Sequence, residues 1–330
     1  MLKAFEVGTV LQQLKDFLPC EVIDAHAHIY DASFTPALRG NSMFAKARQD
    51  AADCFNTIKS VMPGSVCDRA VFLPSPEASF GPSLSETRMM NMRFMVHELE
   101  KNPASIGAAF VGPDDTVQNI EKILVHDRIR GLKCYFYSCP NRWNAFPNEF
   151  LPESAWQIAH AHALFIVLHL GRAKALADAG NMEYIQTMAA KYPRAKLVLA
   201  HCGRSFAAWT AVGSIKELSR FRNIYYDISS INEATPIFNC LKYAGKDHVF
   251  WGSDFPVSSF IGRAVSIGEQ FVWLEQKTLQ AVDAGIAPVT VLEENLMAAY
   301  LAADMLDFTD SDVKALFYTN AENILFSSNL

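Results

Sequence analysis

Residues Glu21–Tyr30 read EVIDAHAHIY, and this stretch decides how the rest of the chain is interpreted. Its apolar start predicts a buried strand, and Asp24, His26 and His28 follow at every second position. Alternate residues of a strand point to the same side, so we expect these three side chains to share one face. Two imidazoles on one face, at the end of an apolar strand, are two arms of a metal site. A pair of polar core residues is the alternative, and it would need several buried hydrogen-bond partners.

The composition allows a large hydrophobic core and argues against a nucleic-acid or membrane protein. Of the 330 residues, 50% are hydrophobic and 19% are charged, and the formal net charge is −6. No run of Lys and Arg is present, which argues against nucleic-acid and anionic-membrane partners. No apolar stretch approaches the ~18 residues that span a bilayer, and the first residues lack the apolar segment of a signal peptide. The seven scattered cysteines form no C-x-x-C pair, so we expect reduced thiols in the cytoplasm.

Downstream of the first strand, short apolar runs alternate with helical patterns. Seven runs have the continuous apolar character of strands buried on both faces: Asp68–Pro74, Ile106–Gly112, Ile129–Tyr137, Leu164–Gly171, Lys196–Gly203, Asn223–Ser229 and His248–Pro256. With the first strand this makes eight strands, each followed by a predicted helix, the last of them near Gly268–Ala284.

Eight such units predict the α/β class and a (β/α)₈ TIM barrel. A doubly wound open sheet is the alternative, but no G-x-G-x-x-G sequence follows the first strand. We expect one domain over residues 1–330. Extra helices are expected at both ends, in residues 4–18 and 288–330.

Candidate functional side chains lie at the ends of several predicted strands, where barrel enzymes place their active sites. They are His26 and His28 on the first strand, Lys133 on the fourth, His169 on the fifth, His201 on the sixth and Asp254 on the eighth. All are metal ligands or proton-transfer groups, and a barrel would bring them to one rim. Their chance occurrence at so many strand ends is improbable, so the sequence predicts a metal site.

The motifs around these residues resemble those of the amidohydrolase superfamily. They are D-A-H-A-H on the first strand, H-L-G on the fifth, H-C-G on the sixth and G-S-D-F-P on the eighth. The resemblance is strongest to the amidohydrolase-related branch that includes aminocarboxymuconate-semialdehyde decarboxylase. It runs from residue 21 to 326, and T-N-A-E-N-I-L-F at Thr319–Phe326 is similar to the final helix of that branch.

The resemblance implies one divalent metal, with zinc as the expected ion. Its ligands would be His26, His28, His169 and Asp254, and Asp254 would also take the proton of the catalytic water. His201 would be a proton-transfer partner or an additional ligand. In binuclear members a Lys on the fourth strand is carboxylated and bridges two metals, which makes Lys133 a further candidate ligand. The alternative is an unmodified Lys133 that binds an anionic substrate or pairs with a carboxylate.

Arg172 and Arg204 lie within three residues of His169 and His201, in HLGR and HCGR. Arg binds carboxylates through two parallel hydrogen bonds, so both are candidate substrate-binding residues. Surface salt bridges are the alternative for each. Asp227, on the seventh strand, is a candidate for supporting the ligands or facing the substrate.

The predicted function is a metal-dependent hydrolase that uses an activated water on an amide, lactone or related carbonyl. The alternative is a metal-dependent decarboxylase, a lyase acting on a small unsaturated or aromatic carboxylic acid, because the same constellation serves both reactions. A binding protein that has lost activity is disfavoured, since no member of the constellation is missing. The expected partner is a small-molecule substrate, and the sequence leaves a homo-oligomer open.

Overall fold

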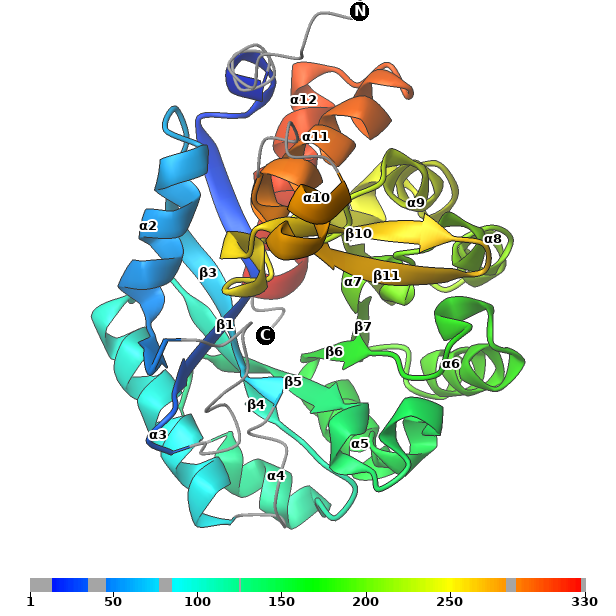
Figure 1. Cartoon of the computed structure of the whole chain (residues 1–330). Helices are drawn as coiled ribbons and strands as arrows, with labels where there is room; N and C mark the ends of the chain where they lie inside the picture. The colour runs from blue at the N-terminus through cyan, green and yellow to red at the C-terminus, as the bar shows by residue number, and fades with distance from the viewer. Residues whose placement is uncertain (1–13, 35–45, 77–84, 125, 283–288, 328–330) are drawn as a thin grey trace, which may run out of the picture.

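The core of the protein is a parallel β-sheet curled into a barrel (Figure 1). A computed structural model describes residues 14–34, 46–76, 85–124, 126–282 and 289–327. The eight parallel strands follow one another around the sheet: β1 (Glu21–Asp31), β3 (Val66–Pro74), β4 (Ile106–Phe110), β5 (Ile129–Tyr135), β6 (Phe165–His169), β7 (Lys196–Leu199), β8 (Ile224–Asp227) and β9 (Val249–Phe250). The short β2 (Arg48–Gln49) pairs with β1 in the antiparallel sense. The prediction of an α/β barrel is confirmed.

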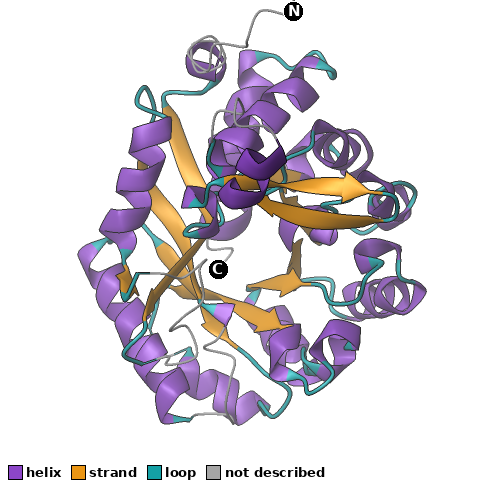
Figure 2. Cartoon of the chain, viewed as in Figure 1, coloured by secondary structure: helices purple, strands orange, loops and turns teal. Residues whose placement is uncertain are grey.

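Helices form an outer layer around the strands (Figure 2). They are α2 (Ala51–Val61), α3 (Glu86–Lys101), α4 (Val117–Ile123), α5 (Glu153–His162), α6 (Ala179–Lys191), α8 (Ser214–Leu218) and α9 (Ala234–Asn239). Asp50, Ser85, Thr116 and Asp178 precede α2, α3, α4 and α6, and each side chain accepts a hydrogen bond from a backbone N–H of the first turn. Such N-caps satisfy donors that the helix itself leaves unpaired, so these sequences start helices at these points.

The barrel closes between its eighth and first parallel strands. The backbone N–H of Ala25 donates to the carbonyl of Trp251 (3.3 Å), and that of Asp254 donates to the carbonyl of His26 (2.7 Å). Gly252 makes this close approach possible, because a Cβ there would lie 2.7 Å from the Cβ of His26. The closed seam excludes the open doubly wound sheet.

The first strand carries a register shift after Asp24, and this changes which side chains face the barrel interior. Ala25 packs among the residues that fill the barrel, whereas the carboxylate of Asp24 reaches the Cys54 thiol of the outer helix α2. Beyond the shift, His26 and His28 face inward. The prediction that Asp24 shares their face is wrong, because the bulge interrupts the two-residue period of the strand.

Asp24 instead fastens the first strand to the eighth. Its carboxylate accepts hydrogen bonds from the backbone N–H (2.8 Å) and the hydroxyl of Ser253, and from the backbone N–H of His26 (3.1 Å). Burial raises the pKa of Asp24 to about 6, against the opposing effect of the hydrogen bonds from Ser253. Because Asp254 follows Ser253 directly, this link fixes the position of Asp254 relative to the first strand.

The C-terminal tail adds α11 (Val291–Asp304), α12 (Asp310–Lys314) and the π-helical turns Ala315–Thr319 and Glu322–Phe326, as expected for this region. Ile324, Leu325 and Phe326 pack in one cluster with residues at the start of the strands, such as Ile106. This packing fills the amino-terminal end of the barrel and leaves the carboxyl ends of the strands for the site. The helix predicted over residues 4–18 lies mostly outside the described residues. Its described part is helical over residues 14–17.

The helix predicted near Gly268–Ala284 is wrong over its first part. The chain there forms a hairpin of β10 (Gly262–Ile267) and β11 (Gln270–Glu275), followed by α10 (Gln276–Val282). The segment QFVWLE is rich in aromatic and β-branched residues, which favour strands. Gly268 has φ +59° and supplies the left-handed residue of the tight turn. None of the described helices is long and apolar enough to cross a membrane.

We expect Gly252→Ala to destabilise the fold by about 1–3 kcal/mol, the usual cost of overpacking. The new methyl group would collide with backbone and Cβ atoms of His26, which cannot rotate away. Urea denaturation measures the change. Gly64→Ala is the matched control, because a Cβ at Gly64 meets nothing within 4 Å. Equal stability of the two variants would contradict the proposed close approach.

Candidate metal centre

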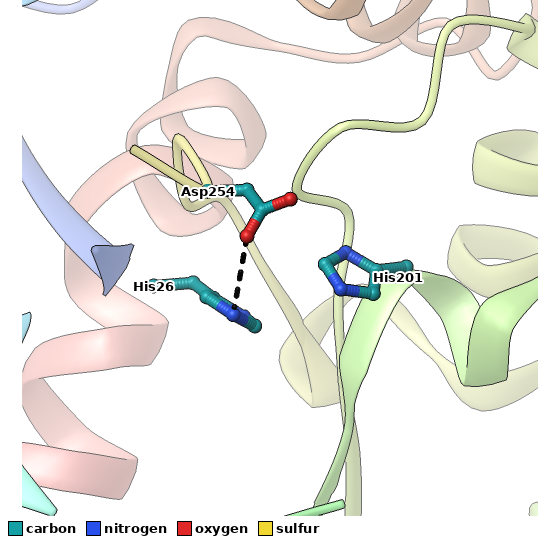
Figure 3. Close-up of side chains that lie close together, drawn as sticks. All are labelled: His26, His201 and Asp254. Atoms are coloured by element: carbon teal, nitrogen blue, oxygen red, sulfur yellow. Dashed lines mark ion pairs between the residues drawn. The ribbon is translucent and has the colours of Figure 1, made fainter. Parts of the chain in front are cut away.

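Three potential ligand atoms converge at the carboxyl end of the barrel. The Nε2 atoms of His26 and His28 are 3.2 Å apart, and Oδ1 of Asp254 lies 3.5 Å and 3.3 Å from them. Zinc binds imidazole and carboxylate at ~2.0–2.2 Å, so ligand atoms on one ion are necessarily close to one another. Figure 3 shows His26, Asp254 and His201 directed toward a common point. Ligand atoms of these three residues also lie within 4.8 Å of one another.

All four candidate histidines are held in the same way through Nδ1. Each Nδ1 faces an oxygen acceptor: Asp227 for His26 (3.0 Å), the Pro74 carbonyl for His28 (2.9 Å), the Leu170 carbonyl for His169 (3.1 Å) and the Ser229 carbonyl for His201 (2.9 Å). Since these oxygens accept hydrogen bonds, Nδ1 carries the proton and Nε2 keeps its lone pair. Support of this kind orients metal-ligating histidines.

The ionisation states suit metal binding. Burial lowers the pKa of His26 to about 4, and it lowers the pKa of His28 and His169 below their usual values, so these imidazoles are neutral. Burial alone would raise the pKa of Asp254, but the imidazoles of His201 and its neighbours lower it to about 2. Neutral imidazoles and an ionised carboxylate are the forms that bind metal ions.

His201 lies in a left-handed turn and not on the strand. β7 ends at Leu199, which corrects the predicted strand Lys196–Gly203, and the turn falls in α7 (Ala200–Arg204). His201, Cys202, Gly203 and Arg204 have φ values of 56°, 53°, 69° and 60°. Left-handed conformation costs a non-glycine residue roughly 1–2 kcal/mol, and such strain concentrates at functional sites. The turn places the ring of His201 5.0 Å from that of His26.

β6 ends at His169, two residues before the predicted strand end at Gly171. The ring centroid of His169 lies 5.1 Å from that of His201, and both rings line one cavity. Lys133 is buried on β5 with its Nζ 4.6 Å from the centre of the Tyr135 ring. Its Nζ has no hydrogen-bond partner among the described residues, and burial lowers its pKa to about 8. No described carboxylate forms an ion pair with Lys133.

A cavity of about 390 Å³ opens above the cluster, within the volume range of small-molecule sites. Its floor contains His28, His169, His201 and Asp254. Its walls are mostly aromatic. The first aromatic group comes from β5 and the segment after it and consists of Tyr135, Phe136, Tyr137 and Trp143. The second comes from the turn after α7 and from β11 and consists of Phe206, Phe271 and Trp273.

The structure separates the two candidate arginines. Arg204 lines the cavity, and its guanidinium donates to the Arg172 carbonyl (2.7 Å). Arg204 forms no ion pair with any carboxylate in the described part of the chain. Arg172 is engaged elsewhere, since its Nε donates to Asp178 (2.8 Å) and its guanidinium lies 3.9 Å from the centre of the Phe146 ring. Arg172 thus binds Arg204 through its carbonyl and is not among the residues that line this cavity, whereas its role in substrate binding stays a prediction.

Sequence reasoning missed several supporting residues. The Ser230 hydroxyl donates to Oδ2 of Asp254 (2.8 Å), and the hydroxyl of Tyr135 lies 3.2 Å from Nδ1 of His28. Asp227, considered from sequence as a supporting group, also accepts from the backbone N–H of His201 (3.0 Å). The two serines of the sequence DISS, at the end of β8, were the signal that could have identified Ser230.

Comparison with known proteins shows the family of the chain. The sequence model described as amidohydrolase matches residues 23–326, which is most of the chain. No curated protein matches the chain at a significant level.

Solved structures share the barrel. A 5-carboxyvanillate decarboxylase from Sphingomonas paucimobilis is 14% identical, with a TM-score of 0.60 over 93% of this chain and 99% of that chain. An amidohydrolase from Burkholderia multivorans with bound zinc is 12% identical, with a TM-score of 0.59 over 92% and 98%. A protein assigned as a 2-pyrone-4,6-dicarboxylic acid hydrolase from Pseudomonas putida is 14% identical, with a TM-score of 0.58 over 95% and 100%. At these identities the similarity establishes the fold.

We expect Asp227→Asn to weaken zinc binding about 10- to 100-fold, the usual effect of removing such a supporting group. The amide carries less negative charge and can turn an N–H toward Nδ1 of His26. Titration calorimetry with zinc measures the affinity. Asp312→Asn, which alters a helix cap far along the chain, is the control and should bind zinc like the unmodified protein. Equal affinities in both variants would contradict this role of Asp227.

Proposed function

Since the chain belongs to the amidohydrolase family, we propose that it is a metal-dependent hydrolase acting on an amide, lactone or related carbonyl of a small carboxylate-bearing substrate. Membership of the family makes it a metal-dependent hydrolase or carboxy-lyase of the amidohydrolase type. The observation that carries the proposal is the convergence of His26, His28 and Asp254 at 3.2–3.5 Å.

The proposed cofactor is one zinc ion. His26, His28, His169 and Asp254 would hold it. His201, in the turn after β7, would serve as the proton-transfer partner or as an additional ligand. Imidazole and carboxylate donors suit zinc, and the donor set includes no thiolate. The unpartnered Nζ of Lys133 is the group whose carboxylation would be needed for a second ion.

When bound, a metal at this position would lower the pKa of a neighbouring water molecule to about 7. Asp254 is ionised, and the Ser230 hydroxyl occupies its Oδ2, which leaves Oδ1 toward the cluster. The ionised carboxylate of Asp254 can therefore touch the metal and also accept the proton of the attacking water as general base. His201, with Nδ1 fixed on the Ser229 carbonyl, keeps Nε2 available to take up and return a proton.

The substrate carboxylate would bind Arg204. Its guanidinium lines the cavity and has no carboxylate partner among the described residues, so an anionic ligand would compensate its charge. The aromatic walls favour a second candidate function, decarboxylation of a flat aromatic or unsaturated acid, because such a substrate stacks on aromatic side chains.

We also propose the setting in which the enzyme works. The number and spacing of the cysteines support a cytoplasmic location. The chain would act as one domain over residues 1–330, alone or as a homo-oligomer, on a small-molecule substrate.

A substrate screen with zinc-loaded enzyme in heavy-oxygen water, combined with carbon dioxide detection, tests the proposal. We expect turnover that incorporates ¹⁸O from the labelled water into the product. This activity should be lost when the metal is removed by a chelator and should return when zinc is added. Asp254→Asn should keep most of the metal and lose about 10²–10⁴-fold in kcat, the typical contribution of a general base. Activity that survives both chelation and His26→Ala would refute the proposal. Carbon dioxide release without incorporation of heavy oxygen would favour the decarboxylase.

We expect Arg204→Lys to raise KM for a carboxylate-bearing substrate about tenfold or more, with a smaller change in kcat. A lysine keeps the charge but cannot form two parallel hydrogen bonds to a carboxylate. Steady-state kinetics on the zinc-loaded enzyme measure both constants. Arg172→Lys is the matched control, since the Arg172 carbonyl that accepts from Arg204 is retained. A KM that is unchanged by Arg204→Lys would exclude Arg204 as the carboxylate site.

A further inference from the structure

We propose that the β10–β11 hairpin selects the substrate, with Phe271 and Trp273 as specificity-determining residues that favour a planar ring acid. This inference rests on the proposed function and adds the shape of the substrate to it. The hairpin is inserted between the eighth strand of the barrel and α11, and it lies beside the barrel mouth near α7 (Figure 1).

The alternation of β11 divides its side chains between the cavity and solvent. Phe271 and Trp273 both line the cavity that contains the candidate ligands His28, His169, His201 and Asp254. Val272, between them, faces the other way and is 40% exposed. The pairing of Phe271 with Ser266 and of Trp273 with Ala264 fixes this register. A strand that turns two large aromatic rings toward a polar site is built for contact with a ligand.

A continuous series of aromatic contacts connects the hairpin to the cluster. Phe206 lies 4.7 Å from Phe271 and 5.5 Å from Trp273, measured between ring centroids. On its other side, Phe206 stacks on His201 at 5.5 Å. The hairpin rings therefore belong to the same surface as the reacting end of the cavity, and a substrate at the cluster would meet them.

Phe271 also contacts Arg204, the candidate binding site for the substrate carboxylate. The guanidinium of Arg204 lies 5.4 Å from the centre of the Phe271 ring, and the arginine is mostly buried. A cation over an aromatic face is attracted to it, so the hairpin helps to orient the guanidinium. An acid bound to Arg204 would then place its ring against Phe271 and Trp273.

Hydrogen bonds connect the hairpin to residues 232 and 233, which follow the residues that support the candidate metal ligands. The Glu233 carboxylate accepts from the backbone N–H (2.8 Å) and the hydroxyl (2.9 Å) of Ser266. The side-chain oxygen of Asn232 accepts from the backbone N–H of Ala264 (2.9 Å). This segment begins two residues after Ser230, which holds Asp254. The aromatic rings are therefore set in place before a substrate binds, which favours one ligand shape.

The other aromatic group of the cavity supplies the second surface. Tyr137 and Trp143 line the cavity from the segment between β5 and α5. In Figure 1 these two elements lie apart from the β10–β11 hairpin. A flat ring can contact aromatic faces on both sides, whereas a saturated ring is thicker and stacks poorly. The geometry points to a planar, conjugated carboxylic acid as the preferred ligand class.

Binding of three carboxylates to the zinc-loaded enzyme tests the proposal by titration calorimetry: 2-naphthoate, benzoate and cyclohexanecarboxylate. We expect both planar acids to bind more tightly than cyclohexanecarboxylate. Phe271→Ala and Trp273→Ala should each weaken 2-naphthoate binding about five- to tenfold, as expected for loss of an aromatic contact, and should reduce the preference for planar acids. Val272→Ala, on the outer face of the same strand, is the matched control and should bind like the unmodified enzyme.

Two outcomes would overturn the proposal. One is equal binding of planar and saturated acids by the unmodified enzyme. The other is a loss of 2-naphthoate binding that is the same in all three variants, which would mean that the hairpin is only structural. The zinc content of each variant is measured in parallel, and binding needs no turnover. The binding result can therefore be interpreted even if the protein proves not to be a hydrolase.

Discussion

The rest of the site depends on the seam that closes the barrel between the first strand and the segment after β9. Asp24 receives the backbone N–H and the hydroxyl of Ser253 across this seam, inside a fully buried environment. The candidate ligands His26 and His28 lie on one side of the seam and Asp254 on the other, so they come together only when the two segments are joined. The bulge that turns Asp24 outward is the same feature that turns His26 inward, which couples closure of the fold to assembly of the site.

A second constraint is the buried carboxylate of Asp227. Burial would raise its pKa, but the neighbouring His26 imidazole holds the pKa well below its usual value, so the group is ionised. One oxygen contacts Nδ1 of His26, and the other accepts from the backbone N–H groups of His201 and Ser229. A buried charge is tolerated when its hydrogen bonds are satisfied, and here those bonds join β8 to β1 and to the turn after β7.

The turn at His201–Arg204 shows how local strain serves the cavity. A regular continuation of β7 would alternate its side chains between the interior and the helix layer. Four consecutive left-handed residues instead bring both the His201 ring and the Arg204 guanidinium to the cavity. Gly203 is needed within this turn, because a Cβ there would lie 2.9 Å from Leu176 in addition to its left-handed strain. The cost is met by the surrounding packing, as at other functional sites.

The sequence by itself determined the barrel, because eight short apolar runs alternating with helical patterns have few other compact solutions. It also placed His26, His28, His169 and Asp254 in or after barrel strands, although β1 continues to Asp31 and β9 already stops at Phe250. Only the tertiary structure decided the side of Asp24, the hairpin before α10 and the different positions of Arg172 and Arg204. Each of these depends on a partner well separated in sequence: Ser253 for Asp24, Glu233 for the hairpin, and the Arg172 carbonyl for Arg204. Periodicity reports which residues are buried locally, whereas such long-range pairings are selected by packing of the whole chain, which no local pattern encodes.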